Sequence, residues 1–156
     1  MLLLLCGCSA KEAAVVEYVT DTWAAPAYTL VFSAPQEFSQ QTFAEGEVYQ
    51  SQDGAVLLVS EVMPGADLEQ AVQAVSGFSW DELEHVCIER EEWTECYLSW
   101  ACVTEQGVQL SRCTLMDDGK CCYALTMTQP ADQVSDNRQL EEDIFSTVSL
   151  EKEAEV

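Results

Sequence analysis

Cysteine is the residue type in this chain with the widest range of chemistry, because its thiolate can act as a nucleophile, a redox group or a metal ligand. The chain of 156 residues contains 8 cysteines and a single histidine, His85. Cys6 and Cys8 lie near the N-terminus, and the others lie in a stretch of strand-forming residues: Cys87, Cys96, Cys102, Cys113, Cys121 and Cys122. An even number of cysteines in an extracellular domain is typical of disulfide bonds.

Turn signals in this stretch predict which side chains meet across neighbouring strands. Turns at residues 106–107 and 118–119 set Cys102 opposite Ser111 and Cys113 opposite Ala124. Strand alternation then places five of the cysteines on one face and Cys121 alone on the other.

A candidate thiol cluster follows from a third turn, at residues 93–94. This turn places Cys87 opposite Trp100 and His85 opposite Cys102, so that Cys102, Cys113 and His85 share one face. A cysteine within hydrogen-bond reach of a histidine that a third group orients is the arrangement of a cysteine nucleophile. The alternative is a structural histidine without a catalytic role.

The same registers predict no directly opposed pair of cysteines. The nearest pairs, Cys102 with Cys113 and Cys113 with Cys122, are diagonal neighbours at about 7–8 Å. The usual Cα–Cα range of a disulfide is about 4.4–6.8 Å. Two interpretations stay open: cysteines that pack as small core residues, or at least one disulfide that a slipped register or bulge permits.

Other catalytic and cofactor motifs are missing from the sequence. A zinc site commonly uses Cys-x2–4-Cys spacing, which does not occur within the domain. The Asp117–Gly119 segment lacks the alternating oxygen ligands of a calcium loop. There is also no phosphate loop and no dinucleotide-binding glycine motif. We therefore predict no metal, no cofactor and no enzymatic activity.

The charge balance excludes nucleic acid as a partner. The chain has 6 lysines and arginines against 28 aspartates and glutamates, for a net charge of −22. Nucleic-acid binding depends on basic side chains that contact phosphates. The sequence also has no basic cluster that would hold it to an anionic lipid surface.

The N-terminus reads as an export signal. Leu2–Leu5 precede small residues, as in the hydrophobic region and cleavage site of a secretory signal peptide. The segment Leu5-Cys6-Gly7-Cys8 resembles the bacterial lipobox. This resemblance implies that Cys8 receives diacylglycerol, becomes the mature N-terminus and anchors the chain to the extracytoplasmic face of the cell membrane. Residues 1–7 are then a partial signal peptide, and residues 8–27 are the lipidated cysteine and a tether.

Residues 28–150 are expected to form a single α+β domain. The pattern predicts a helix that begins after the N-cap Asp67 and ends at Gly77, with Ser79 and Glu82 as the capping box of a short helix. The other predicted elements are strands at residues 28–32, 46–52, 55–59, 85–91, 95–105, 108–117 and 120–128, and a helix at 139–145. Residues 151–156 are expected to be a frayed acidic tail.

The order of these elements is similar to that of the PsbP-like fold. The residues that carry the resemblance are the segment 28–35 with the following Phe38, and the segments Cys122–Thr128 and Phe145–Val148. The resemblance implies a mostly antiparallel sheet with helices packed on it, a PsbP-like sandwich. It also implies a protein that binds or scaffolds rather than catalyses.

Two hypotheses follow for the function. The first is a non-catalytic, membrane-anchored lipoprotein whose domain binds a partner protein, an envelope component or a small ligand. Trp93, at a predicted loop tip, is its best candidate contact residue, whereas Trp100 is expected to pack in the core. The second hypothesis is an envelope thiol-redox protein or cysteine-dependent enzyme that uses Cys102 or Cys113 with His85.

Overall fold

The computed structural model describes residues 25–154 and builds them around one large antiparallel sheet. The strand order is β2-β3-β4-β8-β7-β6-β5 in the seven-stranded sheet, and β1 and β9 form a separate two-stranded ribbon. The α+β architecture with helices on a mostly antiparallel sheet, as the sequence predicts, is confirmed. The elements are β1 (Tyr28–Val31), β2 (Ser39–Phe43), β3 (Gly46–Gln50), β4 (Leu57–Pro64), α2 (Leu68–Ser76), η1 (Trp80–Glu82), β5 (His85–Glu89), β6 (Thr94–Thr104), β7 (Gly107–Asp117), β8 (Cys121–Pro130), η2 (Ala131–Gln133), α3 (Arg138–Phe145) and β9 (Ser149–Lys152).

The proposed lipobox and most of the expected tether lie outside the described residues, which begin at residue 25. Cys8 and Trp23 belong to that part of the chain. Within residues 25–154, neither α2 nor α3 is long and apolar enough to span a membrane.

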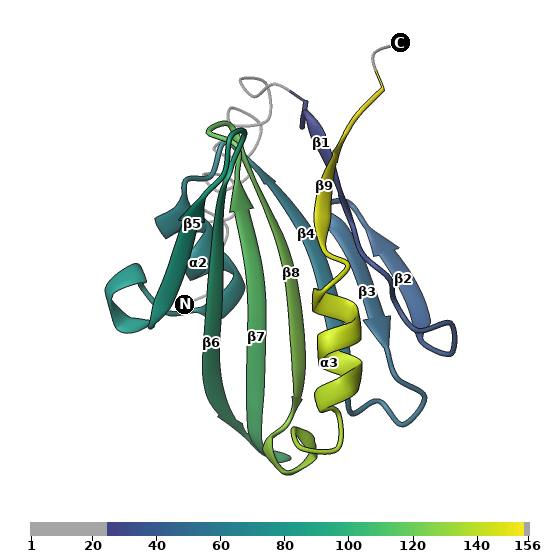
Figure 1. Cartoon of the computed structure of the whole chain (residues 1–156). Coiled ribbons are helices and arrows are strands. Elements are labelled where there is room, and N and C mark those ends of the chain that lie inside the picture. Colours follow the sequence, from purple (N-terminus) through teal and green to yellow (C-terminus); the bar gives the residue numbers. More distant parts are fainter. Residues whose placement is uncertain (1–24, 155–156) are drawn as a thin grey trace, which may run out of the picture.

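The sheet has two faces, each with its own apolar cluster. On one face, which we call the α3 face, α3 and the β1–β9 ribbon cover β8 and its neighbours (Figure 1). On the other face, the α2 face, Ala71 and Val72 of α2 pack against Cys96, Cys113 and other small side chains. Strand β8 is buried on both faces from residue 121 to 127, which makes it the centre of the domain.

The helix α2 begins and ends where the sequence predicts. The Asp67 carboxylate accepts a hydrogen bond from the Gln70 N–H at 2.8 Å, and the Gln70 side chain accepts one from the Asp67 N–H at 3.1 Å. This reciprocal capping box satisfies backbone donors at the helix start. Gly77 ends the helix at a φ of 79°, a conformation that glycine adopts without steric cost.

The predicted order of the meander β5-β6-β7-β8 is correct, but its registers are not. Asp117 pairs with Cys122 rather than with Lys120, and Thr104 pairs with Gly107. The β7–β8 turn is centred on residues 119–120, one residue later than predicted, because the Asp118 N–H bonds to the Cys121 carbonyl at 3.2 Å. The Asp118 carboxylate accepts hydrogen bonds from the N–H groups of Lys120 and Cys121 and so stabilises this turn.

The prediction of a frayed tail from Glu151 is wrong for the first residues of that tail. Residues 149–152 form β9, in which Lys152 pairs with Tyr28 and Leu150 is buried. The ribbon is held on the sheet by the Tyr28 ring, which packs edge-on against Trp93 and Tyr123 at centroid distances of 5.7 and 6.2 Å. The sequence pattern also does not predict strand β2, because its residues, SQQTF, are polar and exposed.

A polar network attaches α3 to the sheet. Arg112 on β7 forms an ion pair with Glu141 at 2.7 Å and lies over the Phe145 ring at 4.5 Å. The other Glu141 oxygen accepts a hydrogen bond from the buried Gln129 amide at 3.0 Å, and Gln129 in turn accepts one from Asn137 at 2.9 Å. Glu141 therefore links the helix to two strands.

We expect Glu141→Ala to lower the free energy of unfolding by about 1–2 kcal/mol, because it leaves the Gln129 amide without an acceptor and removes a partly exposed ion pair. Urea unfolding followed by circular dichroism measures the change. Glu142→Ala is the matched control, since it removes an exposed carboxylate from the same helix and should change stability by less than about 0.5 kcal/mol. Equal losses in the two variants would show that the network does not stabilise α3.

Candidate functional site

The α2 face is covered over only half of its length. α2 packs over the part of the sheet that contains Cys96, Leu115 and Ala124. Beyond the helix, the register places Leu57, Thr128, Ser111 and Trp100 side by side across β4, β8, β7 and β6. These four side chains form the floor of an open groove.

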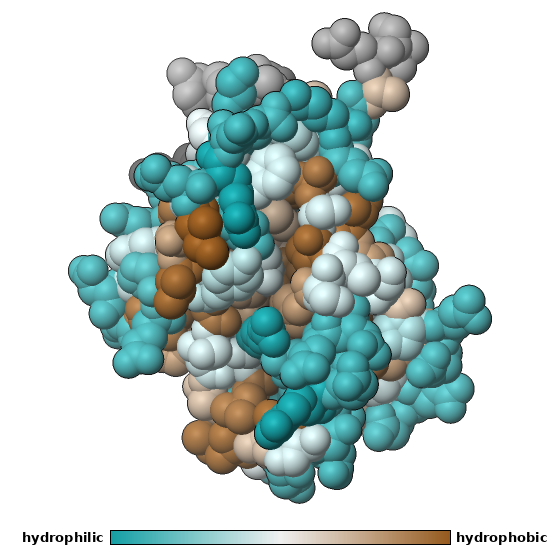
Figure 2. All heavy atoms as spheres, in the orientation of Figure 1, coloured by the Kyte–Doolittle hydropathy of each residue, from teal (hydrophilic) through white to brown (hydrophobic). Residues whose placement is uncertain are grey.

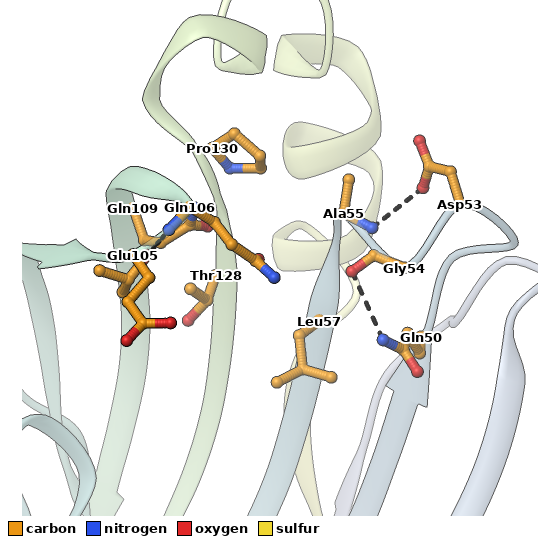
Figure 3. Close-up of a pocket in the computed structure, with 11 residues that line it drawn as sticks. Gln50, Asp53, Gly54, Ala55, Leu57, Glu105, Gln106, Gln109, Thr128 and Pro130 are labelled. Carbon is orange, nitrogen blue, oxygen red and sulfur yellow. Dashed lines mark hydrogen bonds between the residues drawn. The ribbon is translucent and has the colours of Figure 1, made fainter.

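The groove consists of two adjoining hollows that share Thr104, Gln109 and Thr128. The inner hollow, of about 430 Å³, lies against Val75 at the end of α2 and reaches Trp100. The outer hollow has a volume of about 870 Å³. Figure 3 shows the outer hollow between the segment from Gln50 to Leu57 on one side and the β6–β7 hairpin on the other.

Neutral hydrogen-bonding groups dominate the lining of the groove. They comprise hydroxyls and amides, from Gln50, Ser76, Thr104, Gln106, Gln109, Ser111 and Thr128, next to the apolar Leu57, Val59 and Trp100. No arginine or lysine of residues 25–154 lines it. The groove can therefore pair with donors, acceptors and an apolar surface, but it offers no cation for an anionic ligand.

Both walls of the outer hollow are held by their own hydrogen bonds. The Asp53 carboxylate accepts bonds from the Ser51 hydroxyl at 2.6 Å and the Ala55 N–H at 3.0 Å, and these bonds lower the pKa of Asp53. In the opposite wall, the Thr104 hydroxyl accepts a bond from the Gln106 N–H at 3.2 Å. The two loops are thus shaped before a ligand arrives, which reduces the entropy cost of binding.

The inner floor contains polar groups that the protein itself leaves partly unsatisfied. The Ser111 and Thr128 hydroxyls bond to each other at 2.8 Å, whereas the buried Thr126 hydroxyl oxygen has no hydrogen-bond partner of oxygen or nitrogen. Glu61 lines the same hollow, and burial, followed by repulsion from Glu45, raises the pKa of its carboxyl. Burial thus opposes ionisation of the single acid in the inner hollow.

The cysteines pair in a way that the predicted registers exclude. Cys87 lies directly opposite Cys96, and the two form a disulfide with an S–S distance of 2.02 Å and a Cα–Cα distance of 4.1 Å. The expectation that no two cysteines oppose each other is therefore wrong. The expected division between faces is correct, because Cys96, Cys113 and Cys122 belong to the α2 face and Cys121 to the α3 face.

The structure does not bring the expected thiol cluster together. His85 lies opposite Leu98, and Cys102 lies opposite Gln109, four residues further along β6. That separation corresponds to about 13 Å at ~3.3 Å per strand residue. Cys113 lies opposite Leu98 on the other side, at the same distance along the strands from Cys102.

His85 has structural contacts instead. Its ring stacks on Trp80 at a centroid distance of 3.8 Å, and its Nδ1 lies 3.0 Å from the carbonyl oxygen of Leu83. The register error that separates it from Cys102 comes from the β5–β6 turn, which lies at residues 91–92, two residues earlier than expected. Within residues 25–154, no three histidine, cysteine or acidic side chains converge in a way that could hold a metal ion.

Burial keeps the core thiols protonated. It raises the pKa of Cys113 to about 12, against an opposing contribution from the Thr126 hydroxyl, and it raises the pKa of Cys122 to about 12 as well. A thiol in that state is a poor nucleophile near neutral pH. Among the four cysteines outside the disulfide in the described residues, Cys102 alone is exposed, at the edge of the groove.

One of the two tryptophans takes the role that the sequence suggests, and the other does not. Trp93 does follow the β5–β6 turn, but its ring packs on Tyr28 and its indole nitrogen is buried without a partner. Trp100 packs, partly buried, against the apolar cluster of the α2 face, as expected, and its remaining surface lines the inner hollow. Alternation along β6 places Trp100 on the α2 face, but no local sequence signal shows that α2 covers it only in part.

Comparison with known proteins identifies the fold of the domain. No family model matches the chain, and no curated protein matches its sequence. The folded part nevertheless matches solved structures, and its fold is similar to that of PsbP. The solution structure of cyanobacterial PsbP (CyanoP) from Synechocystis sp. PCC 6803 has a TM-score of 0.58 and 8% identity, over 82% of this chain and 95% of that chain.

Two further structures resemble the chain. The crystal structure of LpqN, involved in cell envelope biogenesis of Mycobacterium tuberculosis, has a TM-score of 0.52 and 11% identity, over 87% of this chain and 96% of that chain. A crystal structure from Bacteroides thetaiotaomicron has a TM-score of 0.52 and 12% identity, over 81% of this chain and 46% of that chain. Likeness at such low identity shows the shared fold alone.

The thiol states can be checked by alkylation followed by peptide mass mapping. At pH 8, Cys102 should be the only cysteine of residues 25–154 that is labelled in the folded protein, because Cys113, Cys121 and Cys122 are buried. Denaturation should expose those three, and Cys87 and Cys96 should be labelled only after reduction. Cys102→Ser is the control that should abolish labelling of the folded domain. Labelling of Cys87 in the denatured, unreduced protein would contradict the disulfide.

Proposed function

We propose that the chain is an extracytoplasmic lipoprotein whose domain binds a neutral ligand in the groove of the α2 face and does not catalyse a reaction. The observation that carries the proposal is the half-covered α2 face. A sheet that bears Trp100 and Leu57 beside hydroxyls and amides is left open to solvent there. Pockets for small ligands typically combine an apolar or aromatic surface with a few placed polar groups.

The lining favours a neutral ligand. Three carboxylates line the groove: Asp53 is already bonded within its own loop, burial opposes ionisation of Glu61, and Glu105 lies on the exposed β6–β7 hairpin at the rim. A ligand with hydroxyl or amide groups and one apolar surface can satisfy Gln50 and Gln109 while it stacks on Trp100. An anion would meet no basic side chain in the groove and would approach a chain of net charge −22.

The thiol chemistry argues for binding rather than catalysis. The cysteine nucleophile of the alternative hypothesis needs a base within hydrogen-bond reach. His85 is stacked on Trp80 and lies opposite Leu98, so it does not serve Cys102. Cys113 is fully buried with a raised pKa. The thiol-redox alternative therefore has neither a base beside Cys102 nor a reactive thiol at Cys113.

The membrane anchor rests on the sequence Leu5-Cys6-Gly7-Cys8. Two acyl chains on Cys8 would give stable attachment without a membrane-spanning helix. The likeness to LpqN, which is involved in cell envelope biogenesis, supports a location at the cell envelope. In this arrangement the domain would lie at the extracytoplasmic face of the cell membrane and present the groove to ligands there.

The ligand class can be tested with three fragments that share one ring: benzamide, benzoate and benzylamine. We expect benzamide to shift the NMR signals of the Trp100 indole and of the neighbouring Gln109 side-chain amide, and benzoate to leave them unchanged, because the groove has no cation. Trp100→Ala should abolish the shifts. Trp80→Ala, which removes a tryptophan away from the groove, should not. Stronger shifts with benzoate or with benzylamine than with benzamide would overturn the neutral ligand class, and shifts confined to other surfaces would overturn the proposed site.

The anchor is tested by expression of the full chain in a bacterium that processes lipoproteins. We expect the wild-type protein in the membrane fraction with a diacylglycerol adduct on Cys8, detected by intact mass. Cys8→Ser should remove the adduct and release the protein. Cys6→Ser, a matched change two residues earlier, should retain it. An unmodified Cys8 in membranes, or release by both variants, would refute lipidation at Cys8.

A further inference from the structure

The free edge of β5 has the properties of a docking site for an extended segment of another protein. β5 is the last strand of the sheet and pairs only with β6. The Cα–Cα distance of 4.1 Å between Cys87 and Cys96 is that of a non-hydrogen-bonded antiparallel pair. In such a pair the N–H and C=O groups of Cys87 point away from β6, toward the open edge.

Hydrogen-bonded and non-hydrogen-bonded pairs alternate along the whole of β5. The Arg90 N–H bonds to the Trp93 carbonyl at 2.8 Å, which makes that pair a hydrogen-bonded one. Counting back by two, Val86 and Ile88 direct their backbone groups to β6, whereas His85, Cys87 and Glu89 direct theirs outward. The edge therefore presents three regularly spaced residues whose donors and acceptors can pair with an added strand.

Side chains beside this edge are apolar on the α3 face. Val86 is 63% exposed and Ile88 is 39% exposed. Figure 2, which views this face, shows an apolar patch at the position of β5, surrounded by hydrophilic residues. α3 lies over β7 and β8 through the contacts of Arg112, so it does not cover β5.

The acidic residues beside β5 favour a basic partner segment over an acidic one. Glu84 precedes the strand, Glu89 is its last residue and Glu91 follows it, and all three are exposed and without an ion pair within residues 25–154. The nearby base Arg90 is already bonded to Glu95 at 3.2 Å. A second copy of this chain would set carboxylates against carboxylates, which is unfavourable. A basic segment would meet complementary charge.

We propose that the β5 edge binds an extended, basic segment of a partner protein, which adds a strand to the sheet and alternates apolar with basic side chains. Its apolar side chains contact Val86 and Ile88, and its basic side chains meet Glu84, Glu89 and Glu91. The Cys87–Cys96 disulfide keeps β5 in register on β6 and so holds the edge in place. This site is separate from the groove, which adjoins the β6–β7 hairpin and the segment from Gln50 to Leu57.

The test measures binding of the peptide acetyl-KVKVKVK-amide to the full chain by isothermal titration calorimetry. The control peptide has the same charge but carries N-methyl groups on the alternate amides that would face the strand. We expect N-methylation to weaken binding by at least about tenfold, because it removes the backbone bonds of strand addition. Equal affinities would show attraction by charge alone and overturn the proposal.

A matched pair of variants locates the site. Val86→Lys places a positive charge on the edge and should weaken the unmodified peptide by about tenfold or more. Val103→Lys makes the same change at a residue that is 85% exposed on the β6–β7 hairpin, and should leave the affinity within about twofold. Circular dichroism verifies that both variants fold. Equal weakening in the two variants would place the peptide elsewhere on the acidic surface.

Amide hydrogen exchange separates strand addition from other contacts. Binding should slow exchange at His85, Cys87 and Glu89, while Val86 and Ile88 are already protected by β6. Slowing at all five positions, or at none, would contradict the pairing. Sedimentation of the wild-type chain without peptide should show a monomer. A dimer that Val86→Lys dissociates would assign the edge to a second copy instead, and would likewise overturn the proposal.

Discussion

Strand β8 is buried on both faces from Cys121 to Met127, and this double burial dictates what surrounds it. Its side chains alternate between Tyr123 and Leu125 on the α3 face and Cys122 and Ala124 on the α2 face. Apolar surface costs about 25 cal/mol per Å² when it stays in water, so both faces require a cover. The ribbon and α3 supply one cover, and α2 supplies the other. The polar network around Glu141 and the capping box of α2 position these covers.

The groove exists because α2, the shorter of the two covers, leaves part of its face of the sheet open. α2 spans Leu68–Ser76 and ends at Gly77, so it shields only the part of its face that carries small apolar side chains. Where the helix ends, the floor changes to hydroxyls such as Ser111 and Thr128, which tolerate solvent. Trp100 remains as the large exception, and a large apolar ring in a polar floor is a feature of binding sites. The side-chain chemistry of the groove thus follows from where one helix stops.

Alternation explains why the sequence predicts some properties of the cysteines and not others. Which face a side chain takes depends only on its position along one strand, so Cys121 was correctly separated from Cys113 and Cys122. Which residue lies opposite depends on the connecting loop. The β7–β8 turn lies one residue later than the sequence suggests, the β6–β7 turn one residue earlier and the β5–β6 turn two residues earlier, so every pairing differs from the predicted one. Each slip was even and therefore preserved the faces.

By itself the sequence determined the local features of this protein: the helix between Asp67 and Gly77, most of the strands with their inward and outward faces, and the acidic charge balance. Each of these depends on residues a few positions apart or on composition. Only the tertiary structure decided the Cys87–Cys96 bond, the separation of His85 from Cys102 and the partial exposure of Trp100 in the groove. Those outcomes depend on loop lengths and on how far a helix reaches across a sheet. Such quantities arise from contacts between residues distant in the chain, and no local pattern encodes them.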